Sequence, residues 1–296
     1  MEAVNIFLNH DLVFKGIGLV NARFGVVESV FLVYPANDHY ALAYSYRPRM
    51  ERIRWRPWPA GLLFQDGRLT IMLGVSSHDQ HFRDPDHAGD LHEMVQRVEH
   101  VRRLVGARQK TFAGILPGVL AHEGIVADPP EGDITATVVV QAIKTLTSGF
   151  AEAPAIIVLG GCGFVGSRIV DQLRDTHEPD LHVVDAADPA TQWPAHLHGQ
   201  PALVVNVATR HALPDLLDRL WPGMVILNEV YPEPTPDLIA ALTDMNVAVH
   251  HVVGVEAKAY PPFPAAYAGA IPCCAAWPSP TATVVTRHLN PTTGGD

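Results

Sequence analysis

Three glycines at a fixed spacing are the most chemically informative feature of the sequence. Gly161, Gly163 and Gly166 follow an apolar run at residues 155–159 that is typical of a buried strand, and a helix-compatible stretch follows them. The first glycine permits a tight turn, the second lets the backbone approach a pyrophosphate, and the third lets helix and strand pack closely. The N-terminus of such a helix offers free N–H groups to phosphate oxygens. The pattern predicts a dinucleotide site.

An acidic residue completes this pattern. Asp185 ends the next apolar run, roughly 20 residues after the glycines, where a carboxylate accepts hydrogen bonds from ribose hydroxyls. Residues 186–189 contain no lysine or arginine to bind a 2′-phosphate, so we expect NAD as the cofactor. The alternative is a domain of the same shape that has lost its ligand. The expected cofactor-binding residues are Gly161, Cys162, Gly163, Phe164, Val165, Gly166, Asp185, Ala208 and Thr209.

Hydride transfer also needs a group that gives or takes a proton near the reacting carbon. Lys110 and Asp133 are the candidates, because both flank the cleft expected between two domains. A surface lysine and a helix N-cap aspartate are the simpler alternative. Glu229 and Tyr231, at the end of a later strand, could line the nicotinamide pocket or lie in a solvated loop.

Cys273 is the third catalytic candidate. It follows Pro272, and proline suits the first turn of a helix, where the dipole would lower the pKa of a thiol. A thiolate there could attack a thioester. The alternative is an ordinary buried cysteine, because free cysteine is among the most often buried residues.

Two clusters of charged or polar residues carry weaker signals. The acids Asp79, Asp84 and Asp86 lie among His78, His81, His87 and His92, but their spacing matches no tight ligand motif, so we assign no metal. Five arginines surround Trp55 and Trp58, with Arg52, Arg54 and Arg56 alternating as on a strand. They fit a solvated edge strand or a dock for a carboxylate, a phosphopantetheine or an acidic carrier protein; the full set is Arg47, Arg49, Arg52, Arg54 and Arg56.

The pattern of apolar residues predicts two domains. Residues 1–125 form an α+β domain, strand-rich over the first 75, with strands at 26–34 and 40–46, a hairpin at Asp66-Gly67 and a helix from Asp90. Residues 126–296 alternate short buried runs with helices, which predicts a doubly wound, mostly parallel Rossmann sheet. Its expected helices lie at 135–146, 165–173, 213–220 and 236–245, followed by a returning C-terminal helix.

Composition limits the function classes. The net charge of −10 argues against general binding to nucleic acid or to anionic membranes. The three cysteines form no paired framework, and there is neither a signal-peptide pattern nor an apolar run long enough to span a membrane. We therefore expect a soluble, cytoplasmic protein with a small-molecule substrate, and leave a carrier protein or a homo-oligomer open as partners.

Three segments after the glycine turn resemble the cofactor domain of shikimate-dehydrogenase-like proteins. They are an Asn-x-Ala-Thr turn at 206–209, a strand with a Tyr-Pro loop and a Thr-Pro helix start at 225–238, and Gly-Val-Glu at 254–256. The resemblance covers roughly residues 130–260. Residues 109–114 depart from the substrate-binding loop of that family, so the resemblance does not extend to shikimate as substrate.

The segment around Cys273 is also similar to long-chain acyl-carrier-protein reductases, in which a cysteine after the Rossmann strands is the nucleophile. Three hypotheses follow: an NAD(H)-dependent oxidoreductase acting on a carbonyl or imine of a small polar metabolite, a thioester reductase using Cys273, and a non-catalytic dinucleotide sensor.

Overall fold

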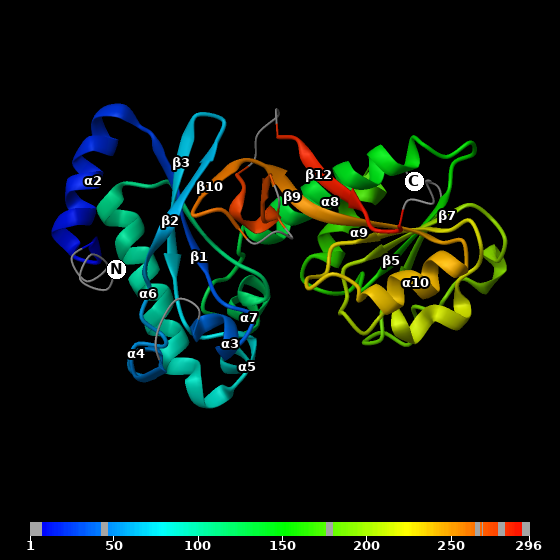
Figure 1. Ribbon diagram of the computed structural model, residues 1–296, viewed down its shortest axis with the longest axis horizontal. Coiled ribbons are helices and arrows are strands. Elements are labelled where there is room, and N and C mark those ends of the chain that lie inside the picture. Colours follow the sequence, from blue (N-terminus) through cyan, green and yellow to red (C-terminus); the bar gives the residue numbers. More distant parts are fainter. Residues whose placement is uncertain are drawn as a thin grey trace. The chain divides into compact units, whose positions relative to one another are not determined.

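A computed structural model describes residues 8–42, 47–175, 180–263, 267, 269–277 and 282–291 (Figure 1). The chain divides into two compact units, one of Met1–Glu131 with Glu256–Ala282 and one of Gly132–Val255 with Thr283–Asp296. The expected boundary, at residues 125 and 126, left everything after it in the nucleotide-binding domain. Instead the chain returns to the first unit, because β10 (Lys258–Tyr260) pairs with β2 (Trp58–Gln65) of that unit.

The first unit is built on a mixed sheet of strand order β10-β2-β3-β1-β4. Its centre is parallel: β1 (Val27–Val33) pairs in parallel with both β3 (Arg68–Gly74) and β4 (Gln109–Phe112). The predicted hairpin is confirmed, since β2 and β3 are antiparallel and joined by Asp66 and Gly67, both with positive φ. Sequence patterning identified β1, β2 and β3 but not this parallel order.

Helices cover one face of the first sheet. Figure 1 shows α2 (Asp11–Phe24) and α6 (Ala88–Val105) side by side, and Phe14 and Val98 from these helices share a core with Val30 and Leu32 of β1. Shorter helices follow the strands: α3 (Asp38–Leu42), α4 (Arg47–Arg52), α5 (Asp79–Phe82), η1 (Pro85–His87) and α7 (Leu116–His122).

Two strand predictions in this unit are wrong. The strand expected at 40–46 begins as α3, and its residues 43–46 lie outside the described residues. The alternating arginines fall in α4 and the turn after it, not on a strand. There the carbonyl of Arg54 accepts hydrogen bonds from the backbone N–H groups of Ser76 and Ser77, which holds the segment as a loop. Such short runs are where periodicity separates helix from strand poorly.

The second unit contains the predicted parallel sheet. Its parallel strands run in the order β9-β8-β7-β5-β6, and β12 (Val284–His288) is antiparallel to β9. The parallel strands are β5 (Ala155–Leu159), β6 (Leu181–Val184), β7 (Ala202–Asn206), β8 (Val225–Asn228) and β9 (Ala248–Glu256). Every residue of β5 and β7 is buried, as expected for strands covered on both faces. The mostly parallel α/β architecture is confirmed.

Helices lie on both sides of this sheet. Figure 1 shows α10 (Pro236–Asp244) on one side and α8 (Glu131–Thr147) with α9 (Gly166–Asp175) on the other. Leu242 of α10 shares a core with Ile157, Val204 and Ile226. The helix expected at 213–220 is instead the 3-10 helix η3 (Pro214–Arg219), and η2 (Ala195–Leu197) is another. No helix among the described residues is both long and apolar enough to cross a membrane.

The expected C-terminal returning helix is also corrected. Within the described residues this segment forms the short strand β11 (Ala270–Ile271) and the three-residue 3-10 helix η5 (Cys273–Ala275), which packs against β4. The side chain of Gln65 exchanges two hydrogen bonds with the backbone N–H and carbonyl of Trp277, each 3.3 Å. These bonds attach Trp277, which follows η5, to β2 of the first sheet.

Candidate functional site

The second sheet has one position that favours ligand binding by its topology. β5 lies between β6 and β7, so the connections leaving β5 and β7 run to opposite sides of the strand order. Ligands of open α/β sheets bind outside the carboxyl ends of the strands at such a switch point. The glycine turn follows β5, and Ala208 and Thr209 follow β7.

The glycines of this turn are required by close packing. A Cβ on Gly160, whose φ is +81°, would lie 2.6 Å from the Cα of Ala208. A Cβ on Gly166 would overlap the carbonyl oxygen of Gly160, and one on Gly161 would lie 2.6 Å from Cγ1 of Val183. The turn is therefore pressed against the end of β7. Gly160, which stands outside the three-glycine motif, was missed by the sequence analysis.

Gly163 is different, because little crowds it. Among the described residues, a Cβ there would meet only the carbonyl oxygen of Gly160 within 4 Å, at 3.2 Å. The exposed backbone of Cys162 and Gly163 is thus the accessible part of the turn, flanked by the half-buried Phe164 and Val165. This is the surface that a pyrophosphate would approach.

Asp185 lies directly against this turn. Its Oδ2 accepts a hydrogen bond of 2.9 Å from the backbone N–H of Cys162, and its Oδ1 accepts one of 2.9 Å from the N–H of Ala187. A carboxylate has about four lone-pair positions, so both oxygens retain acceptor capacity. The arrangement joins the predicted ribose-binding acid and the predicted phosphate-binding turn through a direct hydrogen bond.

Arg168, which the sequence analysis did not single out, braces the same turn. Its guanidinium donates a 2.6 Å hydrogen bond to the carbonyl of Phe164 and lies 4.3 Å from the centre of the Phe164 ring. Its Nε is also 3.3 Å from Oδ1 of Asp133, whose side chain is 63% exposed. Asp133 therefore forms an ion pair with α9, the helix that follows the glycine turn. It lies inside the first turn of α8, which begins at Glu131, and is not an N-cap.

A buried polar chain crosses the strands beside the turn. Asn206 donates a 2.8 Å hydrogen bond to Oδ1 of Asn228, and Nδ2 of Asn228 lies 3.1 Å from Nδ1 of His251. Nε2 of His251 lies 3.7 Å from Glu233, which is also paired with Arg287. Burial lowers the pKa of His251. This chain of polar side chains links the ends of β7 and β8 to the middle of β9.

The two pocket candidates after β8 differ in their surroundings. The backbone N–H of Glu229 donates to the carbonyl of Asn206, which ties this residue to the end of β7. Burial raises the pKa of its half-buried carboxyl group to about 7. Tyr231 is 47% exposed. Glu229 is therefore an acid whose pKa lies near neutral pH.

Lys110 is held by the first unit. Its Nζ is 2.9 Å from Oε2 of Glu99 on α6, and Arg102 and Arg103 pair with the same carboxylate. Hydrogen bonds from Arg102 and Lys110 lower the pKa of Glu99 to about 2. Lys110 and Asp133 are each paired with a residue of their own unit, so the structure gives no direct evidence for a dyad between them.

Glu131 is a buried acid that sequence reasoning missed. It is 2% exposed, and its Oε1 accepts a 2.5 Å hydrogen bond from the backbone N–H of Phe112, while Oε2 has no partner among the described residues. Burial raises its pKa to about 7. No sequence signal marks it, because its burial depends on tertiary contacts such as the hydrogen bond from Phe112 of β4.

The cysteines have unequal access. Cys162 is exposed, Cys274 is half-buried and Cys273 is 7% exposed. Partial desolvation and the carboxylates of Asp185 and Asp188 raise the pKa of the Cys162 thiol. The helix that carries Cys273 is a single 3-10 turn, so it lacks the aligned peptide dipoles on which a lowered thiol pKa was expected.

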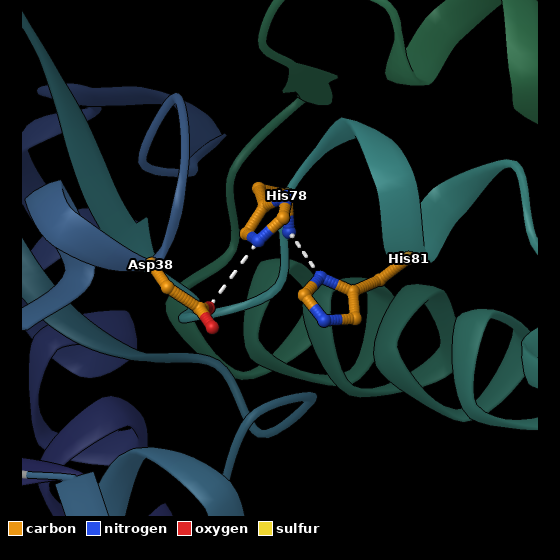
Figure 2. Close-up of side chains that lie close together, drawn as sticks. All are labelled: Asp38, His78 and His81. Carbon is orange, nitrogen blue, oxygen red and sulfur yellow. Dashed lines mark hydrogen bonds and ion pairs between the residues drawn. The ribbon is translucent and has the colours of Figure 1, made fainter.

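The histidine-rich segment forms a cluster in the first unit, shown in Figure 2. His78 and His81 lie together with Asp38, which the sequence analysis left out of this group. Nε2 of His78 is 3.2 Å from Oδ1 of Asp38, and the same oxygen is 2.7 Å from Arg54. His87 pairs with Asp90, and His92 with Gln96. Burial lowers the pKa of His81 to about 4, so this imidazole is neutral.

Comparison with known proteins adds little to this description. The chain matches no family model and no curated protein. Among solved structures, one named as a malic enzyme (malate oxidoreductase) aligns at 16% identity over 78% of this chain and 68% of that chain, with a TM-score of 0.38. An NAD-dependent malic enzyme from Thermotoga maritima aligns at 15% identity over 80% and 71%, with a TM-score of 0.36. The assignment to Rossmann-like α/β proteins rests on the strand order and the turn.

Proposed function

We propose that the protein is an NAD(H)-dependent oxidoreductase that reduces a carbonyl or imine of a small polar metabolite, or catalyses the reverse reaction. The observation that carries the proposal is the contact between the Asp185 carboxylate and the Cys162 N–H at the switch point of the parallel sheet. That contact sets a ribose-binding acid beside a phosphate-binding turn, which is the arrangement a dinucleotide requires.

Each part of the turn has a role in this proposal. The backbone at 161–163 and the start of α9 bind the pyrophosphate, and Asp185 accepts hydrogen bonds from the adenosine ribose. Phe164, Val165, Ala208 and Thr209 line the path of the dinucleotide on either side. When bound, NAD(H) supplies or accepts the hydride.

Cofactor titration tests this binding mode. Calorimetry should give tighter binding of NADH than of NADPH, because Asp185 repels a 2′-phosphate. Asp185→Asn should weaken NADH binding by roughly 10- to 100-fold, the range for a hydrogen bond to a charged group. It should also reduce the preference for NADH over NADPH. Asp188→Asn is the matched control, since Asp188 accepts a 2.9 Å bond from Ala190 in the same loop. Tighter binding of NADPH by the wild type would overturn the role of Asp185.

Lys110 is the proposed proton donor, positioned by Glu99, whose Oε2 lies 2.9 Å from its Nζ, and Asp133 is the other candidate. In a cofactor-consumption assay with a panel of carbonyl and imine substrates, Lys110→Ala should lower turnover by about 10²- to 10⁴-fold. Arg103→Ala is the control, because it removes another cation from Glu99, 3.4 Å away. Equal turnover in both variants would make Lys110 a structural ion-pair residue.

The alternative hypotheses make different demands. Thioester reduction needs an accessible thiolate at Cys273, and the burial of that side chain does not favour it. An acyl adduct on Cys273, detected by intact-mass analysis after incubation with an acyl thioester, would reverse this preference. A dinucleotide sensor would bind NADH and consume none with any substrate.

A further inference from the structure

The first sheet also brings chemically active side chains together at the carboxyl ends of its parallel strands. β1 and β3 are neighbours, and their last residues, Val33 and Gly74, are paired in register. The chain leaves β1 towards Asp38 at the start of α3, and leaves β3 towards His78 at the start of α5. Parallel pairing therefore joins residues that are 40 positions apart in the sequence.

The geometry of this cluster suits metal coordination. One ligand atom from each of Asp38, His78 and His81 lies within 4.8 Å of the other two. Figure 2 shows the carboxylate and both imidazoles turned towards a common space, and the two rings are 4.1 Å apart between centres. Two imidazoles and one carboxylate are the donors that bind Zn²⁺, Fe²⁺ or Co²⁺, whereas Mg²⁺ and Ca²⁺ prefer oxygen ligands alone.

The hydrogen bonds of the cluster also identify the ligand atoms. The backbone N–H of His78 donates to Nδ1 of His81 at 3.2 Å, so Nδ1 carries the one lone pair of that ring, and a cation would have to displace this N–H to bind there. Nε2 of His78 faces Oδ1 of Asp38 at 3.2 Å, and the proton between them is the one that a cation would replace. A neutral His78 can move this proton to its Nδ1, as histidine ligands generally do.

Arg54 is the charge that opposes a cation here. Its guanidinium contacts Oδ1 of Asp38 at 2.7 Å, and the ion pairs of Asp38 with both Arg54 and His78 run through this same oxygen. Asp38 can therefore bind a cation through Oδ2 while Arg54 stays on Oδ1. Trp55 packs edge-on against the His81 ring at 6.4 Å and against Phe82 at 5.6 Å, and this aromatic wall limits water beside His81.

We propose that Asp38, His78 and His81 form a binding site for a divalent transition-metal ion of the Zn²⁺ class. Three protein ligands leave at least one coordination position for water or another ligand, as in catalytic rather than structural zinc sites. The site belongs to the first unit and does not depend on the proposed dinucleotide chemistry.

The test uses tag-free, chelator-treated full-length protein and Co²⁺ as a spectroscopic probe, with Zn²⁺ as competitor. Wild type should bind one Co²⁺ per chain with visible absorption bands that Zn²⁺ removes. His81→Gln and Asp38→Asn should each weaken Co²⁺ binding by at least about 100-fold, the upper end of what loss of an outer-shell partner causes. His100→Gln is the matched control, because His100 pairs with Asp11 at 2.8 Å in the same unit.

Each outcome decides the proposal. Selective loss of Co²⁺ binding in the two ligand variants, with the control unchanged, supports it. The proposal is overturned if the wild type shows no saturable Co²⁺ binding, or if both ligand variants bind Co²⁺ as the wild type does. The Asp38 side chain is 43% exposed, so we expect the Asp38→Asn variant to fold. Its Co²⁺ binding therefore tests the proposal even if the His81→Gln variant fails to fold. Circular dichroism checks the fold of every variant.

Discussion

The two sheets of this molecule carry different groups at the carboxyl ends of their parallel strands. The second sheet ends in a glycine turn whose backbone is exposed at Cys162 and Gly163, with the carboxylate of Asp185 against it. The first sheet ends in imidazole, carboxylate and guanidinium side chains. A backbone site of the first kind is encoded in a few consecutive residues. A side-chain site of the second kind depends on which strands become neighbours.

The largest expected effect is at Gly166. A methyl group there would overlap the carbonyl oxygen of Gly160, and backbone cannot yield as a flexible side chain does. We expect Gly166→Ala to destabilise the protein by about 3 kcal/mol or more, at the upper end of overpacking costs, and to abolish NADH binding. Thermal unfolding and calorimetry measure the two effects.

Gly163→Ala provides the contrast within the same turn. Its methyl group would meet only the Gly160 carbonyl, at 3.2 Å among the described residues, so the fold should keep a near-normal melting temperature. It would, however, occupy the space of the pyrophosphate and weaken NADH binding by at least about tenfold, or 1.4 kcal/mol. Equal loss of stability in both variants would show that the turn is structural, with no special accessible face.

These glycines also show what the sequence could reveal. Apolar runs predicted β5 to β9, and the three-glycine spacing predicted the turn, because both signals are local. Gly160 was missed because only its approach to Ala208, 48 residues away, makes it necessary. Asp38 was missed for a similar reason: its place beside His78 depends on the parallel pairing of β1 and β3, and strand order has no local signal.

Helical segments in the first unit were harder to predict for another reason. α2 carries exposed apolar residues such as Leu12, Leu19 and Phe24, so its apolar residues do not mark one buried face. Glu131 is buried by a contact with Phe112, 19 residues earlier, and spacing does not reveal that contact. Arg168 contacts Phe164, four residues earlier, so the i, i+4 spacing was a local signal that could have found it.

The next prediction concerns the pH dependence of stability, and it compares two acids within the first unit. Glu131 has its pKa raised to about 7 by burial, so the folded state binds its proton more tightly than the unfolded state. Its stabilising effect is complete below pH 4.5 and is lost as the pH rises through 7. The expected loss is about 3 kcal/mol at most. Urea unfolding between pH 5 and 8 measures the slope.

Glu131→Gln keeps an oxygen to accept the Phe112 N–H but cannot ionise, so it should flatten that slope. Glu99→Gln is the opposite control. The pKa of Glu99 is lowered to about 2, so its stabilising effect is present above pH 4.5 and is lost only as the pH falls towards 2. An unchanged slope between pH 5 and 8 in Glu131→Gln would refute the buried-acid interpretation, and Glu229 of the second unit would then be the acid to replace.

The smallest expected effect is on thiol reactivity, and it tests whether the two units bind their ligands separately. Cys162 is exposed in the glycine turn, while Cys274 is half-buried in the first unit. Desolvation and the neighbouring carboxylates raise the pKa of Cys162, so its alkylation should be slow at pH 7 and faster as the pH rises. Saturating NADH should cover the turn and slow alkylation of Cys162 by about tenfold or more, because only the free protein reacts.

The controls for this protection are Cys274 and Zn²⁺. NADH should leave the alkylation of Cys274 unaffected, and Zn²⁺ should not protect Cys162. Asp185→Asn should raise the rate at Cys162 slightly, because it removes a negative charge beside the thiol. Peptide mass spectrometry after timed alkylation resolves the thiols individually. If NADH slows both cysteines equally, the protection comes from a change in the whole molecule, and the view of two separate sites at the ends of two sheets fails.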